Sequence, residues 1–311
     1  MLLYAVIHRL IRPLAVAMLS VLLAGSGCTA RDSLPASVTE TAAVSAPEGF
    51  LLAELGDEAI YRGDLILVNN DTPYHFPEEP LLQRVAEGKT GSYFIRSTEL
   101  LLAPAALEAV NALLDDFLAQ GGSKTVNLVA AWRSEETQQR LFERSAERSG
   151  LAHAESYVAR PGGSEHHTGL AVDFSLYFPD GSSADFTGEG DYAWITENAP
   201  RYGLILRYPE EKELLTGIAY EPWHFRYVGI PHALAVRELG MCLEEYLDYL
   251  RTFPYEGEHL FLSYEDERYE VWFEEGSDVH LPIEGDYAVS GNNRDGVIVT
   301  RKLLDDASPG E

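Results

Sequence analysis

The chain has 311 residues, of which 46% are hydrophobic and 23% are charged, a composition typical of one large or two small globular domains. Its formal net charge of −27 at pH 7 gives a surface that repels nucleic-acid phosphates and argues against a polyanion-binding function, although a local positive pocket is compatible with it. We therefore expect no nucleic-acid partner. We also expect the protein to be a monomer.

Residues 1–27 have the layout of a secretory signal. A segment containing Arg9 and Arg12 precedes an apolar run over 14–24 that is too short to span a bilayer comfortably, and small residues follow it. The end of this segment, Ser-Gly-Cys at Cys28, resembles a bacterial lipoprotein signal, in which the cysteine is lipidated after cleavage. Ordinary cleavage and an uncleaved N-terminal anchor are the alternatives. We expect an exported protein on the extracytoplasmic face of a bacterial membrane, lipid-anchored at Cys28.

The rest of the chain is predicted to have three parts. Residues 28–58 are rich in Ala, Ser, Thr, Pro and Glu and read as a flexible linker. Residues 59–255 are predicted to form the main domain, in which Cys242 is a buried, unpaired side chain. Residues 256–304 contain strand-like runs separated by Gly, Asp and Asn clusters, and are predicted to form a small β module or extension.

Local patterns in the main domain predict both strands and helices. Order is expected to begin near Ile60. The best helix covers 98–118, with Pro104 in its first turn, and Ser134 is a good N-cap for a second helix that runs to about Arg148. Strands are predicted at 65–71 (including a polar turn), 126–132 and 204–207, and further helices at 231–239 and 243–250.

The stretch from Ser164 to Asp173 places two side chains that can bind a metal, His166 and Asp173, in a glycine-rich loop that enters an apolar strand. In a strand Asp173 faces away from Val172 and Phe174, and a carboxylate in such a setting has to be paired, hydrogen-bonded or bound to a cation. From this stretch alone, a loop-capping aspartate beside two solvent-facing histidines is an equally good interpretation.

A third candidate ligand, His224, lies downstream in an alternating run. His224 and Arg226 are expected on one face of a strand, with Trp223 on the other face as part core and part pocket wall. Hydrolytic zinc sites commonly use three protein ligands and leave a position for water, and histidine with carboxylate suits zinc.

Glu221 and Arg133 are the candidate reacting groups near such a metal. Pro222 disfavours a continuous strand, so Glu221 is expected in a turn that can face the metal and exchange protons with a water molecule and a leaving amine. Arg133 lies between a strand and a helix, where it can hold a carbonyl oxygen or a substrate carboxylate. A surface arginine paired with Glu135 or Glu136 is the alternative.

These motifs resemble the VanY/VanX-type D,D- and L,D-carboxypeptidases of peptidoglycan metabolism, peptidase family M15. The resemblance rests on Ser-x-His-x-x-Gly-x-Ala-x-Asp at 164–173 and on Glu-x-Trp-His at 221–224. Arg-Ser-x-x-x-Gln, beginning at Arg133, is similar to the Tyr-Arg-Ser-x-x-x-Gln signature of the VanY branch, with Trp132 in place of the tyrosine. The resemblance covers about residues 60–250.

The resemblance implies a complete set of site residues. One Zn²⁺ would be bound by His166, Asp173 and His224. Glu221 would be the general base for metal-activated water, and Arg133 the substrate or transition-state stabiliser. Substrate contacts would come from Ser164, Gln138 and Trp223. The family pattern treats the position of His167 as variable, so His167 is not expected to bind the metal.

We expect an α+β fold with a central antiparallel sheet, helices packed against it, the zinc site on the sheet face and a small C-terminal β extension. The expected function is removal of the C-terminal D-alanine from peptidoglycan stem peptides, by D-Ala-D-Ala or L,D-carboxypeptidase action. A peptidoglycan endopeptidase and a non-catalytic, zinc-stabilised module that binds wall peptides are the alternatives.

Overall fold

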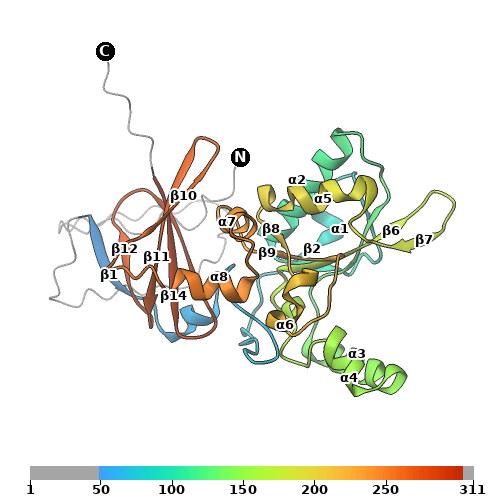
Figure 1. Ribbon diagram of the computed structural model, residues 1–311, viewed down its shortest axis with the longest axis horizontal. Coiled ribbons are helices and arrows are strands. Elements are labelled where there is room, and N and C mark those ends of the chain that lie inside the picture. The colour runs from blue at the N-terminus through green and yellow to red at the C-terminus, as the bar shows by residue number, and fades with distance from the viewer. Residues whose placement is uncertain (1–48, 304–311) are drawn as a thin grey trace, which may run out of the picture.

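The computed structural model describes residues 49–303. The predicted signal over 1–27, the lipidation site Cys28 and most of the predicted linker lie outside this range. Between residues 49 and 303, no helix combines the length and apolar character needed to cross a membrane. This part of the chain forms a mixed lobe around a central sheet and a β lobe of mainly C-terminal strands, with α7 (His232–Leu239) and α8 (Leu243–Leu250) between them (Figure 1).

A six-stranded sheet organises the mixed lobe, and its strand pairs are antiparallel except for β3 with β5. The spatial order is β3 (Phe94–Ile95), β5 (Val126–Ala130), β6 (Ala171–Tyr177), β9 (His224–Tyr227) and β8 (Leu204–Leu206), with β7 (Ser183–Asp185) paired to β6. The expectation of an α+β fold with its site on a sheet is confirmed, and the parallel β3–β5 pair is the exception to a fully antiparallel sheet.

Alternation along the strands separates the core from the site. Val172 and Phe174 of β6 pack with Phe225 of β9 in the core that includes the apolar face of α2 (Pro104–Ala119). Asp173 and His224 lie at the intervening positions and face the other side of the sheet. One face of the sheet therefore supplies stability, and the other is free to carry chemistry.

Short helices and one further strand pair complete the part of the chain outside the two sheets. Ser134 caps α3 as predicted, because its hydroxyl accepts a hydrogen bond of 3.2 Å from the backbone N of Thr137. The other helices are α1 (Val85–Gly88), α3 (Glu135–Ser149), α4 (Leu151–Tyr157), α5 (Ala193–Asn198) and α6 (Glu213–Thr216). The 3-10 helices are η1 (Asp57–Tyr61), η2 (Glu165–Thr168), η3 (Gly190–Tyr192), η4 (Ala199–Tyr202) and η5 (Glu210–Lys212), and β2 (Gln83–Arg84) pairs with β4 (Leu101–Leu102).

Two local predictions are corrected by the fold. The predicted helix over 98–118 begins only at Pro104, because Leu101 and Leu102 are used in β4. The predicted strand at 65–71 is irregular, although Leu65 and Leu67 are buried as expected. Its backbone groups bond to side chains and loops instead of a neighbouring strand: the N of Leu65 donates to Ser290 Oγ, and that of Leu67 to the carbonyl of Asn292.

The β lobe contains a four-stranded antiparallel sheet and a separate strand pair. The sheet has the order β10 (Leu260–Tyr264), β11 (Glu267–Glu275), β14 (Gly296–Leu303) and β13 (Asp286–Gly291). The pair joins β12 (Asp278–Pro282) to β1 (Phe50–Glu54), a segment that was predicted to be flexible linker. The short apolar run of β1 is ordered because it packs around Trp272 of the β lobe.

A shared core joins the β lobe to the mixed lobe. The apolar faces of α7 and α8 pack against Val271 and Phe273 of β11 and against Ile298 of β14, in a cluster that also includes Ile205 of the central sheet. Cys242, at the start of α8, is buried and free as predicted. The change at residue 256 is therefore a change in secondary structure within a continuously packed region.

Candidate metal centre

The three predicted ligands meet on one face of the central sheet. The antiparallel register of β6 and β9 places Asp173 directly opposite His224. η2 brings His166 alongside them and is capped by Gly169, whose φ of 74° is a left-handed conformation that favours glycine. One ligand atom from each of His166, Asp173 and His224 lies within 4.8 Å of the others.

The neighbours of each imidazole identify which nitrogen it turns toward Asp173. The Nδ1 of His166 is 2.8 Å from the carbonyl oxygen of Ala131, which can only accept, so Nδ1 carries the proton and Nε2 presents its lone pair. That Nε2 lies 3.2 Å from Asp173 Oδ2. His224 turns Nδ1 toward the same carboxylate, 2.9 Å from Oδ1. Both rings therefore direct one nitrogen at the space beside Asp173.

The donor set fits a metal cation. Asp173 Oδ1 is buried, and its contact with His224 Nδ1 at 2.9 Å lacks hydrogen-bond geometry, which leaves it without a well-formed hydrogen bond among the described residues, although a buried carboxylate oxygen is normally paired. Burial lowers the pKa of His166 to about 4, which keeps its ring neutral. Burial opposes a charge on His224 too, but the carboxylates of Asp173 and Glu165 outweigh it and raise the pKa to about 9. The site thus favours positive charge, which a metal cation would supply.

Glu221 lies in the predicted turn beside these ligands. Its Oε2 is 3.7 Å from His224 Nδ1, and its backbone carbonyl accepts a hydrogen bond of 3.2 Å from the N of His224. Burial raises the pKa of the Glu221 carboxyl to about 7. A carboxyl that titrates near neutrality can both take up and release a proton at physiological pH.

Arg133 points into the site instead of forming the surface pair that was the alternative. Its Nη2 is 4.0 Å from Asp173 Oδ2, and its Nη1 donates to Gln138 Oε1 at 2.8 Å. Gln138 is 1% exposed and its Nε2 donates to the carbonyl of Ala159 at 2.7 Å. These two bonds tie Gln138 to Arg133 and to the backbone, so that it supports Arg133, and its expected contact with substrate stays a prediction.

His167 is held away from the metal position, in agreement with the sequence. Its Nδ1 lies 2.7 Å from the carbonyl of Arg133, and its Nε2 accepts a hydrogen bond of 3.2 Å from the N of Gly162. Both ring nitrogens are therefore occupied. Ser164, the first residue of the motif, is buried next to η2.

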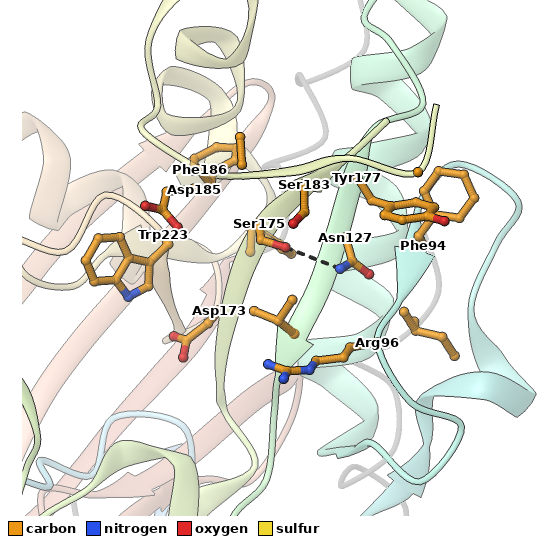
Figure 2. A pocket seen from close by; sticks show the side chains of 15 residues that line it. Phe94, Arg96, Asn127, Asp173, Ser175, Tyr177, Ser183, Asp185, Phe186 and Trp223 are labelled. Atoms are coloured by element: carbon orange, nitrogen blue, oxygen red, sulfur yellow. Dashed lines mark hydrogen bonds between the residues drawn. The ribbon is translucent and has the colours of Figure 1, made fainter. Parts of the chain in front are cut away.

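A groove of about 930 Å³ extends from Asp173 along the site face of the sheet. Trp223 forms part of its wall near Asp173, as expected, and Asn127 is hydrogen-bonded to Ser175 at 3.2 Å along its floor (Figure 2). Arg96 lines the same groove and extends toward Asp173 (Figure 2).

Sequence reasoning missed the carboxylate behind the site. Glu165 is 1% exposed, and the two arginines that contact it, Arg207 and Arg226, are 0% exposed. The sequence did contain one indication of such a carboxylate. The alternation that puts Arg226 on the same face as His224 implies a buried arginine, and a buried arginine requires a carboxylate partner. Nothing in the sequence identified Glu165 as that partner.

Two imidazoles that each turn one nitrogen toward Asp173, and an adjacent carboxyl that titrates near neutrality, form the donor set of a metallohydrolase centre. A family model described as VanY, D-alanyl-D-alanine carboxypeptidase, matches residues 99–230. A D-alanyl-D-alanine carboxypeptidase of Enterococcus faecium is 33% identical over 253 residues, which cover 78% of this chain and 77% of the relative. The chain belongs to the VanY D-alanyl-D-alanine carboxypeptidase family and is an enzyme of this zinc metallopeptidase class.

Two further relatives support the assignment. VanXYC of Enterococcus gallinarum, a bifunctional D-Ala-D-Ala dipeptidase and D-Ala-D-Ala carboxypeptidase, is 43% identical over 143 residues, which cover 42% of this chain and 71% of the relative. The crystal structure of the vancomycin resistance D,D-dipeptidase VanXYg, in complex with a D-Ala-D-Ala phosphinate analogue, is similar with a TM-score of 0.73 and 31% identity. That likeness covers 82% of this chain and 99% of the other, so it includes both lobes.

Proposed function

We propose that this protein removes the terminal D-alanine from peptidoglycan stem peptides that end in D-Ala-D-Ala. The observation that carries the proposal is Glu221: a buried carboxyl with a pKa raised to about 7 lies beside the His166, Asp173 and His224 cluster. A site that served folding alone would need no such proton-exchanging group. The VanXYg structure, which holds a D-Ala-D-Ala phosphinate analogue, supports the same substrate class.

His166 Nε2, one oxygen of Asp173 and His224 Nδ1 would hold a zinc ion. Zinc accommodates this mixture of imidazole and carboxylate, with a position left for water or substrate. When bound, it would supply Lewis-acid chemistry, polarising a carbonyl group and lowering the pKa of a water molecule.

The side chains around the cluster would carry the proton and the charge. Glu221 would accept a proton from the attacking water and return it to the nitrogen of the departing D-alanine. Arg133, held in place by Gln138, would stabilise the carbonyl oxygen as it becomes negative. Both groups are largely shielded from water, which strengthens their interaction with developing charge.

The groove offers a receptor for an anionic peptide. Arg96 lines it and has no ion-pair partner among residues 49–303, in a protein whose net charge is otherwise strongly negative. Its guanidinium would hold a substrate carboxylate near the metal position, and the C-terminal carboxylate is the one that every carboxypeptidase substrate carries.

Defined peptides test the proposal. A pentapeptide ending in D-Ala-D-Ala should release one D-alanine, detected by mass spectrometry. Amidation of its C-terminal carboxylate should slow cleavage about 10- to 100-fold, the loss of one charge-assisted hydrogen bond. Equal rates on free and amidated peptides would identify an endopeptidase, and zinc binding without cleavage would identify a binding module. Faster cleavage of a tetrapeptide with a single terminal D-alanine would assign L,D-carboxypeptidase activity.

We further propose that the enzyme acts outside the cytoplasmic membrane. The signal-like segment over 1–27 and Cys28 support this location, since the wall peptides it would cleave are assembled there.

A further inference from the structure

A carboxylate without a role in the proposed mechanism lies behind His224. Glu165 immediately precedes the ligand His166, and its Oε2 is 3.5 Å from His224 Nε2. Both atoms are buried, and neither has a hydrogen-bond partner in the part of the chain that the structure describes, so each is the nearest polar group available to the other. Because Nδ1 of the same ring faces Asp173, Glu165 contacts the nitrogen that is turned away from the metal position.

Two buried arginines hold Glu165 in place. Its Oε1 accepts hydrogen bonds from Arg207 Nε and from Arg226 Nη1, each at 2.8 Å. Arg226 is itself anchored to the backbone, donating through Nη2 to the carbonyls of Asp64 and Ile66 at 2.9 Å. These contacts occupy Oε1 fully and leave Oε2 directed at the imidazole.

Arg207 connects Glu165 to α8. Its Nη1 and Nη2 donate to the two carboxylate oxygens of Glu244 at 2.9 and 2.6 Å. Two carboxylates and two guanidinium groups are thus buried together with balanced charge. Buried ion clusters are poor sources of stability, because desolvation offsets much of the attraction and apolar replacements are often as stable. A specific task for Glu165 explains its charge better than stability does.

We propose that Glu165 is a positioning residue for the metal centre: it accepts the Nε2 proton of His224 and so fixes the ring with Nδ1 presented to the metal. Carboxylates that receive the second N–H of a ligating histidine orient the ring and increase its basicity. Arg207 and Arg226 in turn fix the carboxylate. This inference rests on the proposed metal site and not on the peptide that is cleaved.

Zinc affinity measures this role without any substrate. We expect Glu165→Gln to raise the zinc dissociation constant about 10- to 100-fold in a chelator-competition assay. Glu244→Gln is the matched control, since it removes the same charge from the same ion cluster but contacts no metal ligand; its zinc affinity should stay within about threefold of wild type. The absorption spectrum of the cobalt-substituted protein should change in Glu165→Gln and not in Glu244→Gln.

Two further measurements cover the case in which Glu165→Gln does not fold. The double variant Glu165→Gln with Arg226→Gln removes one charge of each sign, and it should show the same loss of zinc affinity. In the zinc-loaded wild type, nitrogen NMR should place the His224 proton on Nε2. Three results would each overturn the inference. The first is wild-type zinc affinity with an unchanged cobalt spectrum in the Glu165 variants. The others are an equal loss of zinc affinity in Glu244→Gln and a His224 proton on Nδ1. A different peptide specificity would not affect these results.

Discussion

Asp173 and His224 lie opposite each other in the antiparallel pair of β6 and β9, with Oδ1 and Nδ1 2.9 Å apart. A one-residue slip between these strands would turn one of the two side chains to the α2 face and destroy the ligand pair. Phe174 and Phe225 prevent such a slip, because both side chains are buried in the core on that face and would be exposed by it. The core of the mixed lobe therefore sets the geometry of the metal centre.

Glu221→Gln should separate catalysis from metal binding. Removing the general base should lower kcat about 100- to 10,000-fold, while zinc affinity stays close to wild type because the three ligands remain. Turnover on a D-Ala-D-Ala peptide and bound zinc are measured on the same preparation. Persistence of wild-type turnover would show that another group moves the proton.

Zinc binding should stabilise the fold, and this stabilisation should require the proposed ligand Asp173. At a free zinc concentration of 100 times the dissociation constant, binding should add about 2.7 kcal/mol to the free energy of unfolding, seen as a higher Tm than in chelator. Asp173→Ala should abolish that shift. Asp185→Ala, which removes a carboxylate from the same groove but not from the ligand cluster, is the control and should retain it.

Arg96→Gln tests how the groove recognises its substrate. Loss of a charge-assisted bond to the terminal carboxylate should raise KM about 10-fold or more, with a smaller effect on kcat. On a C-terminally amidated peptide, the variant and the wild type should behave alike. Arg148→Gln removes an exposed arginine at the end of α3, outside the groove, and should leave KM unchanged on both peptides.

His232 should make stability depend on pH. It is buried between Tyr246 Oη and Thr300 Oγ1, each at 2.8 Å, and burial lowers its pKa to about 3. A lowered pKa in the folded state means that the unfolded chain binds more protons between pH 3 and 6.5. The neutral, buried His232 ring therefore stabilises the fold fully above pH 6.5. As the pH falls below 6.5, the free energy of unfolding decreases by at most about 5 kcal/mol. Urea unfolding of wild type and His232→Gln should show a difference that shrinks with acidity, and a constant difference would contradict this.

Cys28→Ala tests the proposed anchor. If Cys28 is lipidated after cleavage, wild-type protein should sediment with membranes and the variant should not. Mass spectrometry of the N-terminal peptide would show the lipid directly. Retention of the variant on membranes, with residues 1–27 still attached, would indicate an uncleaved anchor instead.

Several features of the fold could be predicted because they depend on local patterns. Ser134 caps α3, the apolar spacing of 243–250 gives α8, and the alternation from Trp223 onward separates His224 from Phe225. The short strand β1 could not be predicted in this way. Three of its residues, Phe50, Leu51 and Ala53, pack with Trp272 and its neighbours, which lie more than two hundred positions away in the chain.

By itself, the sequence determined the chemistry: two histidines, an aspartate and a glutamate in two short motifs specify which ligands and which base are available. Only the tertiary structure decided how they are held. Gln138 supports Arg133 from behind, and Glu165 with two buried arginines supports His224. The physical reason is that ligand chemistry belongs to a side chain alone, whereas burial and charge pairing arise only when distant segments pack together.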